Sequence, residues 1–384
     1  MKWEKVKLGE LYEVHNGLSK AGKFFGEGYP FLTFSTVFNN YFIPKQITDL
    51  VQSTEKEQES YSIRRGDVFV TRTSETSDEL GMSCVALKDY PMATYNGFTK
   101  RMRPITNRVF PEYIGYYMRL PSFRGEFRAF STMTTRASLR NEDLLGLEVK
   151  LPSIEIQKQI ADILSAYDDL IENNQKQIKL LEEAARRLYK EWFVDLRFPG
   201  HENTKIVDGV PEGWIKEEIG KIIKKVHRTK QIVASEYKDE GSIPIVDQSR
   251  AFVAGYTNDL EARVDFGIPL IVFGDHTRIV KLIQFPFAKG ADGTQLIISD
   301  CLEMPQRLLY CSIMNVDLSN YHYARHFKYL KEEKIMIPTV KVANEFENNV
   351  TGIFSKIQNC RDEIIRCQKT RNLLLPKLMS GEVE

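Results

Sequence analysis

The feature that most constrains the fold of this 384-residue chain is an internal repeat at a constant offset of 186 residues, from residue 149 to residue 335. The segments VKLPSIEIQKQIADIL (149–164) and IMIPTVKVANEFENNV (335–350) each have an apolar strand-like end, then a proline, then branched residues two and four places later. Both continue into a long helical pattern. A chain of this length can hold two or three domains with separate cores. The repeat therefore predicts a tandem duplication in the order globular–helix–globular–helix.

The helical pattern of the first copy repeats at alternating intervals of four and three residues. Its seam positions are Ile160, Leu164, Tyr167, Ile171, Asn174, Ile178, Leu181, Ala185, Leu188 and Trp192. Such a sustained heptad seam is typical of a coiled coil, and a polar residue such as Asn174 on the seam typically fixes its register. In the second copy we expect Cys360 and Cys367 to be small buried hydrophobic residues. Pro376 is expected to end that helix near Leu375.

The segments ahead of the helices repeat more weakly and are strand-rich. GDVFVTRTS (66–74) corresponds to PLIVFGDHT (269–277), and the following segments end in Asn96-Gly97 and Asp292-Gly293, which are dipeptides typical of hairpin turns. The predicted fold class is α+β, with two mixed globular domains separated by two long antiparallel coiled-coil helices. Similar helices that leave similar domains can pair about a pseudo-twofold axis, with a globular domain at each end.

The predicted division has four parts. Residues 1–150 and 197–337 form the globular domains, and residues 151–196 and 338–384 form the helices. The segment 194–213 is rich in proline and glycine, which marks the join between the two copies.

The formal net charge is only +1, but basic residues are clustered. From Lys100 to Arg140 there are nine basic residues and two acidic ones, and residues 221–230 carry five cations and no acid. Such clusters favour a surface that meets phosphates, although a solvated helix face is the alternative. The N-terminus is charged and no apolar run approaches 18 residues, so we expect a cytoplasmic protein without a membrane partner.

Two matches to enzyme motifs lack a required partner. The segment 17–23 fits G-x-x-x-x-G-K, but Phe24 follows where a P-loop needs Ser or Thr to bind Mg²⁺. In GDHTR (274–278), Asp275 and His276 could serve a metal ion or act as a base, yet no nucleophile motif accompanies them. The corresponding residues of the first copy read VTRTS. We therefore expect no catalytic residue and no metal ligand.

The run LPSIEIQKQIADILSAYDDLIENNQKQIKLLEEAARRLYKEWF (151–193) closely resembles the central conserved region of the specificity subunits of type I restriction–modification systems. Stretches of the second globular segment, among them VFGDHTR (272–278), GTQLI (293–297) and YARHFKYLKEEKIMIP (323–338), look like stretches of the second target-recognition domain in that family. The resemblance covers nearly the whole chain.

This resemblance implies a non-catalytic subunit that reads double-stranded DNA. Each globular domain would recognise one half of a bipartite, asymmetric site, while the helices would set the spacer and dock two adenine-methyltransferase subunits. Motor–nuclease subunits would complete the restriction complex. S-adenosylmethionine, ATP and Mg²⁺ would belong to these partners, and no cofactor is expected in this chain. The target sequence does not follow from the resemblance.

The side chains best placed to read DNA are polar ones at loop tips beside strands. Arg favours guanine, Asn and Gln favour adenine, and Ser, Thr and Lys often hold phosphates. The candidates in the first domain are Arg72, Thr73, Ser74, Asn96, Lys100, Arg101, Thr134, Thr135 and Arg136. The candidates in the second domain are Gln248, Ser249, Arg250, His276, Thr277, Arg278, Asp292, Thr294, Gln295, Arg325 and His326, with Arg228 and Lys230 expected on phosphates.

Two other functions stay open at the level of sequence. The chain could be a coiled-coil scaffold whose globular ends bind proteins, or an enzyme with an unrecognised site. Salt-dependent binding of duplex DNA would separate a DNA reader from a scaffold. Loss of all activity without a partner subunit would argue against an enzyme.

Overall fold

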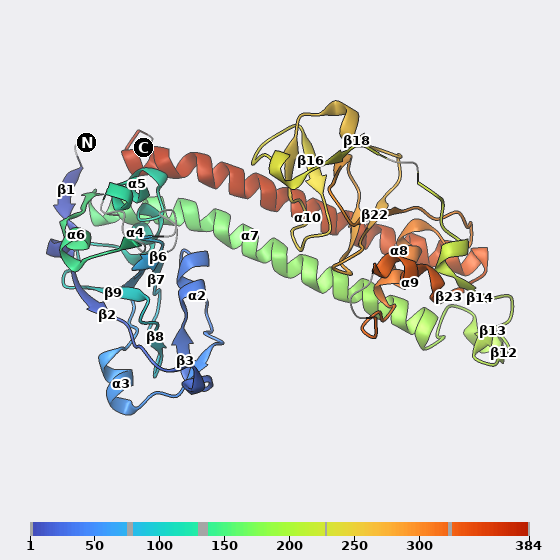
Figure 1. The fold of residues 1–384 in the computed structure, drawn as a ribbon, viewed down its shortest axis with the longest axis horizontal. Coiled ribbons are helices and arrows are strands. Elements are labelled where there is room, and N and C mark those ends of the chain that lie inside the picture. The colour runs from blue at the N-terminus through green and yellow to red at the C-terminus, as the bar shows by residue number, and fades with distance from the viewer. Residues whose placement is uncertain (1–2, 75–79, 130–136, 227–228, 322–324, 383–384) are drawn as a thin grey trace. The chain divides into compact units, whose positions relative to one another are not determined.

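The computed structural model describes residues 3–74, 80–129, 137–226, 229–321 and 325–382, and Figure 1 traces their helices and strands. The chain forms two compact units. Unit 1 is Met1–Glu172 with Ile365–Glu384, and unit 2 is Asn173–Ile364. Each unit contains part of both long helices, and the four-part division of the sequence remains a prediction. No helix in the described residues is long and apolar enough to cross a bilayer.

The two long helices are α7 (Ile154–Tyr189), which continues into a π-helical turn (Lys190–Val194), and α10 (Val340–Ser380). Every seam position from Ile160 to Trp192 is buried or partly buried, as the sequence predicts. Cys360 and Cys367 are likewise buried free thiols. The apolar seam therefore faces the interior of each unit in turn.

The prediction that Pro376 ends its helix is wrong, because α10 continues through it to Ser380. Proline removes one backbone hydrogen bond and crowds the preceding turn. Leu375, Leu378 and Met379 nevertheless lie buried in the core of unit 1. We attribute the continuation of the helix to the burial of these three side chains on either side of the proline.

Unit 1 combines short helices with short strands. Its helices are α1 (Leu8–Leu11), η1 (Gly22–Phe24), α2 (Phe34–Asn39), α3 (Glu55–Ser60), α4 (Pro111–Tyr117), α5 (Pro121–Ala129) and α6 (Asn141–Gly146). Its strands are β1 (Glu4–Lys7), β2 (Tyr12–Asn16), β3 (Phe25–Leu32), β4 (Leu50–Val51), β5 (Val68–Thr71), β6 (Thr73–Ser74), β7 (Ser83–Val85), β8 (Thr94–Tyr95), β9 (Thr99–Pro104), β10 (Ala137–Ser138) and β11 (Glu148–Leu151).

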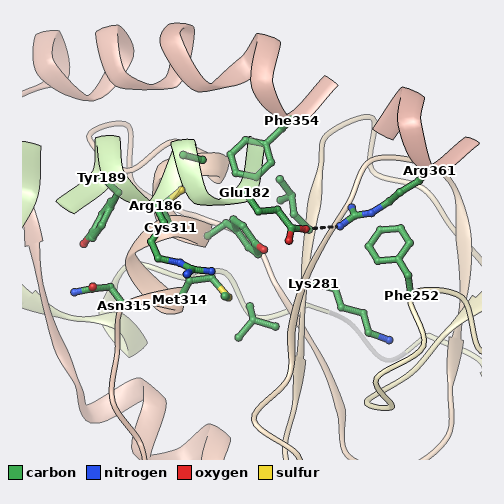
Figure 2. A pocket seen from close by; sticks show the side chains of 14 residues that line it. Glu182, Arg186, Tyr189, Phe252, Lys281, Cys311, Met314, Asn315, Phe354 and Arg361 are labelled. Carbon is green, nitrogen blue, oxygen red and sulfur yellow. Dashed lines mark hydrogen bonds and ion pairs between the residues drawn. The ribbon is translucent and has the colours of Figure 1, made fainter. Parts of the chain in front are cut away.

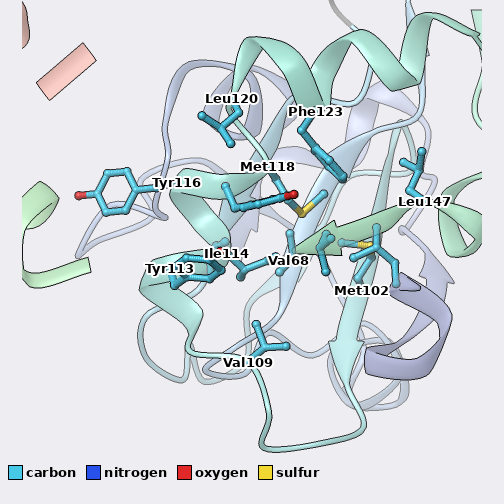
Figure 3. Close-up of a cluster of buried hydrophobic side chains, with 14 of the residues drawn as sticks. Val68, Met102, Val109, Tyr113, Ile114, Tyr116, Met118, Leu120, Phe123 and Leu147 are labelled. Carbon is cyan, nitrogen blue, oxygen red and sulfur yellow. The ribbon is translucent and has the colours of Figure 1, made fainter. Parts of the chain in front are cut away.

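The strands of unit 1 form an antiparallel sheet in the order β2-β9-β5-β7, a three-stranded sheet β4-β3-β8, and the pairs β1-β11 and β6-β10. Figure 3 shows the main core, where Val68 of β5 and Met102 of β9 pack under α4 and α5. Tyr116 turns its hydroxyl away from this core (Figure 3) and donates a hydrogen bond of 2.6 Å to Asp168 Oδ2 on α7. Asp168 also pairs with Arg371 of α10. The globular part of unit 1 is thus anchored to both helices.

Unit 2 has the same kinds of elements. Its helices are η4 (His201–Asn203), η5 (Ile219–Lys221), η6 (Ala234–Glu236), η7 (Leu260–Ala262), α8 (Gln306–Met314) and α9 (His326–Glu332). Its strands are β12 (Ile206–Val207), β13 (Val210–Pro211), β14 (Ile215–Glu218), β15 (Gln231–Ile232), β16 (Ile243–Val246), β17 (Gly255–Thr257), β18 (Arg263–Val264), β19 (Leu270–Gly274), β20 (Val280–Ile283), β21 (Phe287–Gly290), β22 (Thr294–Ile297) and β23 (Lys334–Ile337).

The long helix α10 caps α8 in unit 2. The backbone N–H groups of Arg307 and Leu308 donate to Glu347 Oε2 at 3.2 and 3.1 Å, and the Arg307 side chain donates to Glu347 Oε1 at 3.0 Å. The first N–H groups of a helix have no partner within the helix. The Glu347 carboxylate therefore satisfies these N–H groups, and its negative charge is stabilised by the positive end of the α8 dipole.

The same order of pairings occurs in both units. β1 pairs with β11 and β14 with β23, and in each case the second strand precedes a long helix. In unit 1, β5 pairs antiparallel with both β7 and β9. In unit 2, β19 likewise pairs antiparallel with both β20 and β22. β3 pairs with β8 and β16 with β21, both parallel. Both units are therefore mixed and strand-rich, as predicted.

The expectation of hairpin turns at Asn96-Gly97 and Asp292-Gly293 is wrong. β8 pairs with β3, whereas β9 pairs with β2 and β5, so the Asn96-Gly97 turn passes from one sheet to another. β21 pairs with β16 and β22 with β19, so the Asp292-Gly293 turn does the same. The dipeptides mark tight turns, but pairing partners elsewhere in the chain decide which strands meet.

Candidate nucleic-acid interface

Three loops of unit 2 meet at the ends of its central strands. β16 and β21 run parallel with Val246 beside Lys289, so the loops that follow them leave on the same side. β19 and β22 run antiparallel with Gly274 opposite Thr294, so the end of β19 lies beside the start of β22. Residues 247–251, 275–278 and 291–293 are therefore brought together by the topology of the sheets.

Gln248 ties the three loops to one another. Its Nε2 donates to the backbone oxygen of Asp292 at 2.9 Å, and its Oε1 accepts from the backbone N–H of His276 at 3.1 Å. Thr277 Oγ1 donates to the backbone oxygen of Gln248 at 2.7 Å. Both ends of the Gln248 amide are thus engaged within the protein.

Gly293 is required at the centre of this arrangement. Its φ of +80° lies in the left-handed region, which glycine adopts without steric cost. A Cβ at this position would lie 2.7 Å from His276 Cδ2 and 2.8 Å from Gln248 Nε2. Glycine therefore permits both the turn and the close approach of the three loops.

An open cleft of about 970 Å³ lies beside these loops. Its lining is polar and includes more cations than carboxylates. The cations are Lys224, Lys225, Lys289, Arg325 and Lys331, and the carboxylates are Asp275 and Asp292. Asp275 is 4% exposed and its Oδ1 accepts the backbone N–H of Phe327 at 2.8 Å. The cleft is therefore a site of excess positive charge within a nearly neutral chain.

Lys289 is the cation that points most clearly to an anionic ligand. It lies on β21, is partly buried, and has its pKa lowered by burial. No carboxylate among the described residues forms an ion pair with it. A buried charge is costly unless it is paired, so an anion in the cleft would stabilise Lys289. The sequence analysis did not select this residue, although a lone lysine in the apolar strand segment FAKG, directly before a turn, was a usable signal.

His326 lies behind the cleft and is not a surface residue. It is 6% exposed, and its Nδ1 has no hydrogen-bond partner among the described residues. Burial, and secondarily the nearby Arg278 guanidinium, lower the pKa of His326 from its ordinary value of 6.5. The folded protein therefore holds a neutral imidazole at this position.

We expect the stability of unit 2 to fall at mildly acid pH because of His326. Below about pH 6.5 the unfolded chain binds a proton at this residue more readily than the folded chain, so the free energy of unfolding decreases as pH falls towards the lowered native pKa. Above that range the residue has no effect. Chemical denaturation of wild type and His326→Leu between pH 7.5 and 5 should give a flatter profile for the variant. Equal slopes would contradict this role.

The other sequence candidates of unit 2 lie in varied environments. Arg278 has a φ of +60° and donates from Nη1 to the backbone oxygen of Leu318 at 2.9 Å, so its guanidinium is held within the protein. Thr294 is 1% exposed. Lys230 pairs with Asp259 at 2.7 Å and Glu261 at 3.0 Å. The exposed candidates are Lys230, Arg250, His276, Thr277, Arg278, Asp292 and Arg325, with Gln248, Ser249 and Gln295 partly buried.

In unit 1 the candidates are more often structural. Lys100 and Arg101 are buried, with Lys100 bonded to Asn141 Oδ1 and Arg101 Nη1 donating to the backbone oxygen of Ser62 at 2.8 Å. Burial argues against direct DNA contact by these two residues, and equally by Thr294 and His326 in unit 2. Asn96 Oδ1 accepts from the N–H of Phe98 at 2.7 Å, which is turn chemistry.

Three further candidates of unit 1 lie near its loop tips. Arg72 Nη1 is 3.4 Å from Asn16 Oδ1. Thr73 and Ser74 form β6, whose backbone pairs with β10. Thr134, Thr135, Arg136 and Arg228 lie outside the described residues. DNA contact by the accessible candidates of both units remains a prediction.

In the described part of the basic stretch 100–140, several cations make contacts within the protein. Arg103 pairs with the fully buried Asp67, with Nη2 2.7 Å from Oδ2. Arg119 donates from Nη2 to the backbone oxygens of Val37 and Asn40 at 2.8 and 2.7 Å, and its burial lowers its pKa to about 10. Much of this positive charge is therefore used to hold the fold of unit 1.

A second cavity of unit 2, of about 200 Å³, is a weaker candidate (Figure 2). It lies between α7, α8, α10 and β20. Arg361 pairs with Glu182 at 2.9 Å and stands 3.7 Å from the centre of the Phe252 ring. Lys281 Nζ donates to the backbone oxygen of Asp247 at 2.8 Å. These charged groups are satisfied within the protein, whereas Lys289 in the cleft has no ion pair in the part of the chain that the structure describes.

Comparison with known proteins is consistent with a polar, DNA-directed site. A family model described as a type I restriction modification DNA specificity domain matches residues 1–183. The type I restriction enzyme MjaIX specificity subunit of Methanocaldococcus jannaschii is 28% identical over 412 aligned residues, which span 99% of this chain and 93% of that protein. The EcoR124I/EcoR124II specificity subunit of Escherichia coli is 31% identical over 97 residues, 25% of this chain and 24% of that protein.

Among solved structures, the S subunit of a type I restriction–modification system from M. genitalium has a similar fold. It covers 98% of this chain and 96% of its own, at 15% identity and a TM-score of 0.59. Residues 1–183, which include the N-terminal part of unit 1, are therefore similar to a type I restriction modification DNA specificity domain. Because a specificity subunit also aligns over nearly the full length, the whole chain is similar to type I restriction enzyme specificity subunits.

Proposed function

We propose that this chain is the DNA-recognition subunit of a type I restriction–modification complex and reads one half of a bipartite, asymmetric site with each unit. The observation that carries the proposal is the cationic cleft of unit 2, where the partly buried Lys289 has no acid partner among the described residues. Phosphate contacts position a protein on DNA, and polar side chains at loop tips then read base edges. The cleft and the three loops beside it supply both kinds of group.

The repeat in the sequence supports a tandem duplication. The matched pairings of β1-β11 and β14-β23, each followed by a long helix, are what a duplicated reader would have. We propose that α7 and α10 pair antiparallel as a coiled coil that sets the spacer between half-sites. The Asp168–Arg371 and Glu182–Arg361 ion pairs, one in each unit, support such pairing.

The partners follow from this assignment. Two adenine-methyltransferase subunits would dock on the helices, and motor–nuclease subunits would join them in the cytoplasm. S-adenosylmethionine, ATP and Mg²⁺ would be bound by those subunits, and this chain would carry no catalytic residue. A coiled-coil protein scaffold is the alternative function.

Replacing Lys289 with alanine is expected to weaken duplex binding by several-fold at low salt, because one phosphate contact is lost. The slope of log affinity against log salt should become shallower by about 1. Fluorescence anisotropy of the complex with its methyltransferase subunits on a labelled duplex measures both quantities. Lys238→Ala, which removes an exposed lysine of unit 2 that does not line the cleft, is the matched control. Equal effects of the two variants would remove Lys289 from the interface.

The bipartite site itself is tested by co-expressing this chain with its methyltransferase subunit and mapping N6-methyladenine across the host genome. A single two-part motif with a fixed gap is the expected result. An assembled complex that methylates no motif would favour the scaffold.

A further inference from the structure

Three glutamines lie at or beside the cleft of unit 2, Gln231, Gln248 and Gln295, and their side chains differ in what they can do. Gln248 has both ends of its amide bonded, to the backbone of Asp292 and of His276. Gln295 lines the cleft from β22, and its side chain makes no hydrogen bond within the part of the chain that the structure describes. Of these, Gln295 presents a free donor and a free acceptor to a ligand, and Gln248 does not. Gln231 also lines the cleft, but from the exposed start of β15.

The strand fixes the position from which Gln295 acts. Its backbone pairs with Phe273 of β19, which is 1% exposed, and its neighbours Thr294 and Leu296 are both buried. Gln295 thus lines the cleft from a strand whose backbone is held by its neighbours, and its partly buried side chain has no hydrogen-bond partner among the described residues. A reading group on a rigid strand is placed more precisely than one on a loop.

The surroundings of Gln295 favour a role in specificity rather than in affinity. Lys289 and Arg325 line the same cleft and suit phosphates. A neutral amide adds little to the attraction for a phosphate backbone. Its N–H₂ and carbonyl groups match the N7 acceptor and N6 donor of adenine, a bidentate pair that other bases do not offer in the major groove.

We propose that Gln295 is a specificity-determining residue that reads one adenine of the half-site bound by unit 2, and that Gln248 is a positioning residue that holds the three loops. This inference rests on the proposed DNA-reading function. It assigns different roles to two residues of the same type at the same cleft, so the two can be compared directly.

The test maps N6-methyladenine motifs in cells that express the methyltransferase subunit with wild type, Gln295→Ala, Gln295→Glu or Gln248→Ala. Gln295→Ala should relax the motif at one position of one half-site, with a loss of roughly 5- to 100-fold in discrimination against the other bases. Gln295→Glu should move the preference at that position from adenine towards cytosine, whose N4 group donates to a carboxylate. Gln248→Ala should lower methylation at all sites without changing the motif.

The same comparison can be made in vitro by measuring how the purified complexes bind duplexes with a single base substitution at each motif position. Gel filtration establishes that each complex assembles. An unchanged motif with Gln295→Glu would overturn the assignment. So would a complete loss of duplex binding by an assembled Gln295→Ala complex, because one base contact does not supply that much affinity. A wild-type complex that yields no motif would instead refute the proposed function itself.

Discussion

Replacing Phe346 with alanine should lower the free energy of unfolding of unit 2 by about 3–5 kcal/mol, as for other fully buried phenylalanines. Phe346 of α10 is 0% exposed. Its ring meets those of Phe193 and Trp192 edge to face, with centroids 5.1 and 5.6 Å away, and that of Tyr189 at 6.2 Å. Truncation would leave a cavity where α10, the end of α7 and the following π-helical turn pack together. Few substitutions in the chain remove so many aromatic contacts.

Urea unfolding followed by tryptophan fluorescence measures this loss, since Trp192 lies in the affected cluster. Leu373→Ala is the control on the same helix. Leu373 is 58% exposed, so its truncation should change stability by no more than about 0.5 kcal/mol. If both variants lost similar free energy of unfolding, the assignment of Phe346 to the buried face of α10 and of Leu373 to its exposed face would be wrong.

Replacing Asp67 with asparagine should destabilise unit 1 by about 3 kcal/mol, because it removes the negative charge that pairs with the Arg103 guanidinium. Asp67 is 0% exposed and accepts hydrogen bonds from Arg103 Nε and Nη2 and from the backbone N–H of Arg64. Removing one partner of a buried ion pair typically costs about 3–5 kcal/mol. The lower end of this energy range applies because the Arg103 side chain is 17% exposed.

Hydrogen exchange followed by mass spectrometry locates this effect. Peptides that cover β5 and β9, which flank the pair, should exchange faster in Asp67→Asn, while unit 2 peptides should not change. Asp143→Asn is the control, because its partner Arg140 is 74% exposed and surface pairs contribute little. Faster exchange throughout both units would point to a general effect on folding instead.

The long helices could be predicted from sequence because their signal is local and repeated. A heptad seam specifies which residues are buried whatever the partner is, and the seam from Ile160 to Trp192 is buried or partly buried accordingly. Pro376 failed as a stop signal because the buried residues around it, Leu375 and Leu378, belong to a core that the local pattern does not contain.

The role of each charged residue could not be predicted in the same way. Arg101 and Arg103 look like part of a basic surface until Ser62 and Asp67, more than 30 residues earlier, supply their oxygen partners. Lys289 shows the reverse case, because the packing of β21 leaves it partly buried and without an ion pair among the described residues. Whether a charge binds a ligand or holds the fold depends on which distant groups fold against it.

Turn residues were predicted better than charged residues but less well than the long helices. Gly293 was correctly placed in a turn, but the turn joins two sheets and closes the loops around Gln248. The candidates Gln248, His276, Thr277 and Asp292 were therefore grouped by the structure itself, through bonds that a sequence motif does not encode.

The carboxylate of Glu347, which caps α8 from α10, limits which sequences could replace the segment between the two long helices. A replacement for the segment between the long helices would have to offer a helix start with free N–H groups and a basic side chain where Arg307 now stands. A sequence without them would leave a partly buried charge on α10. Replacement of this segment is therefore limited to sequences that keep this contact between α8 and α10.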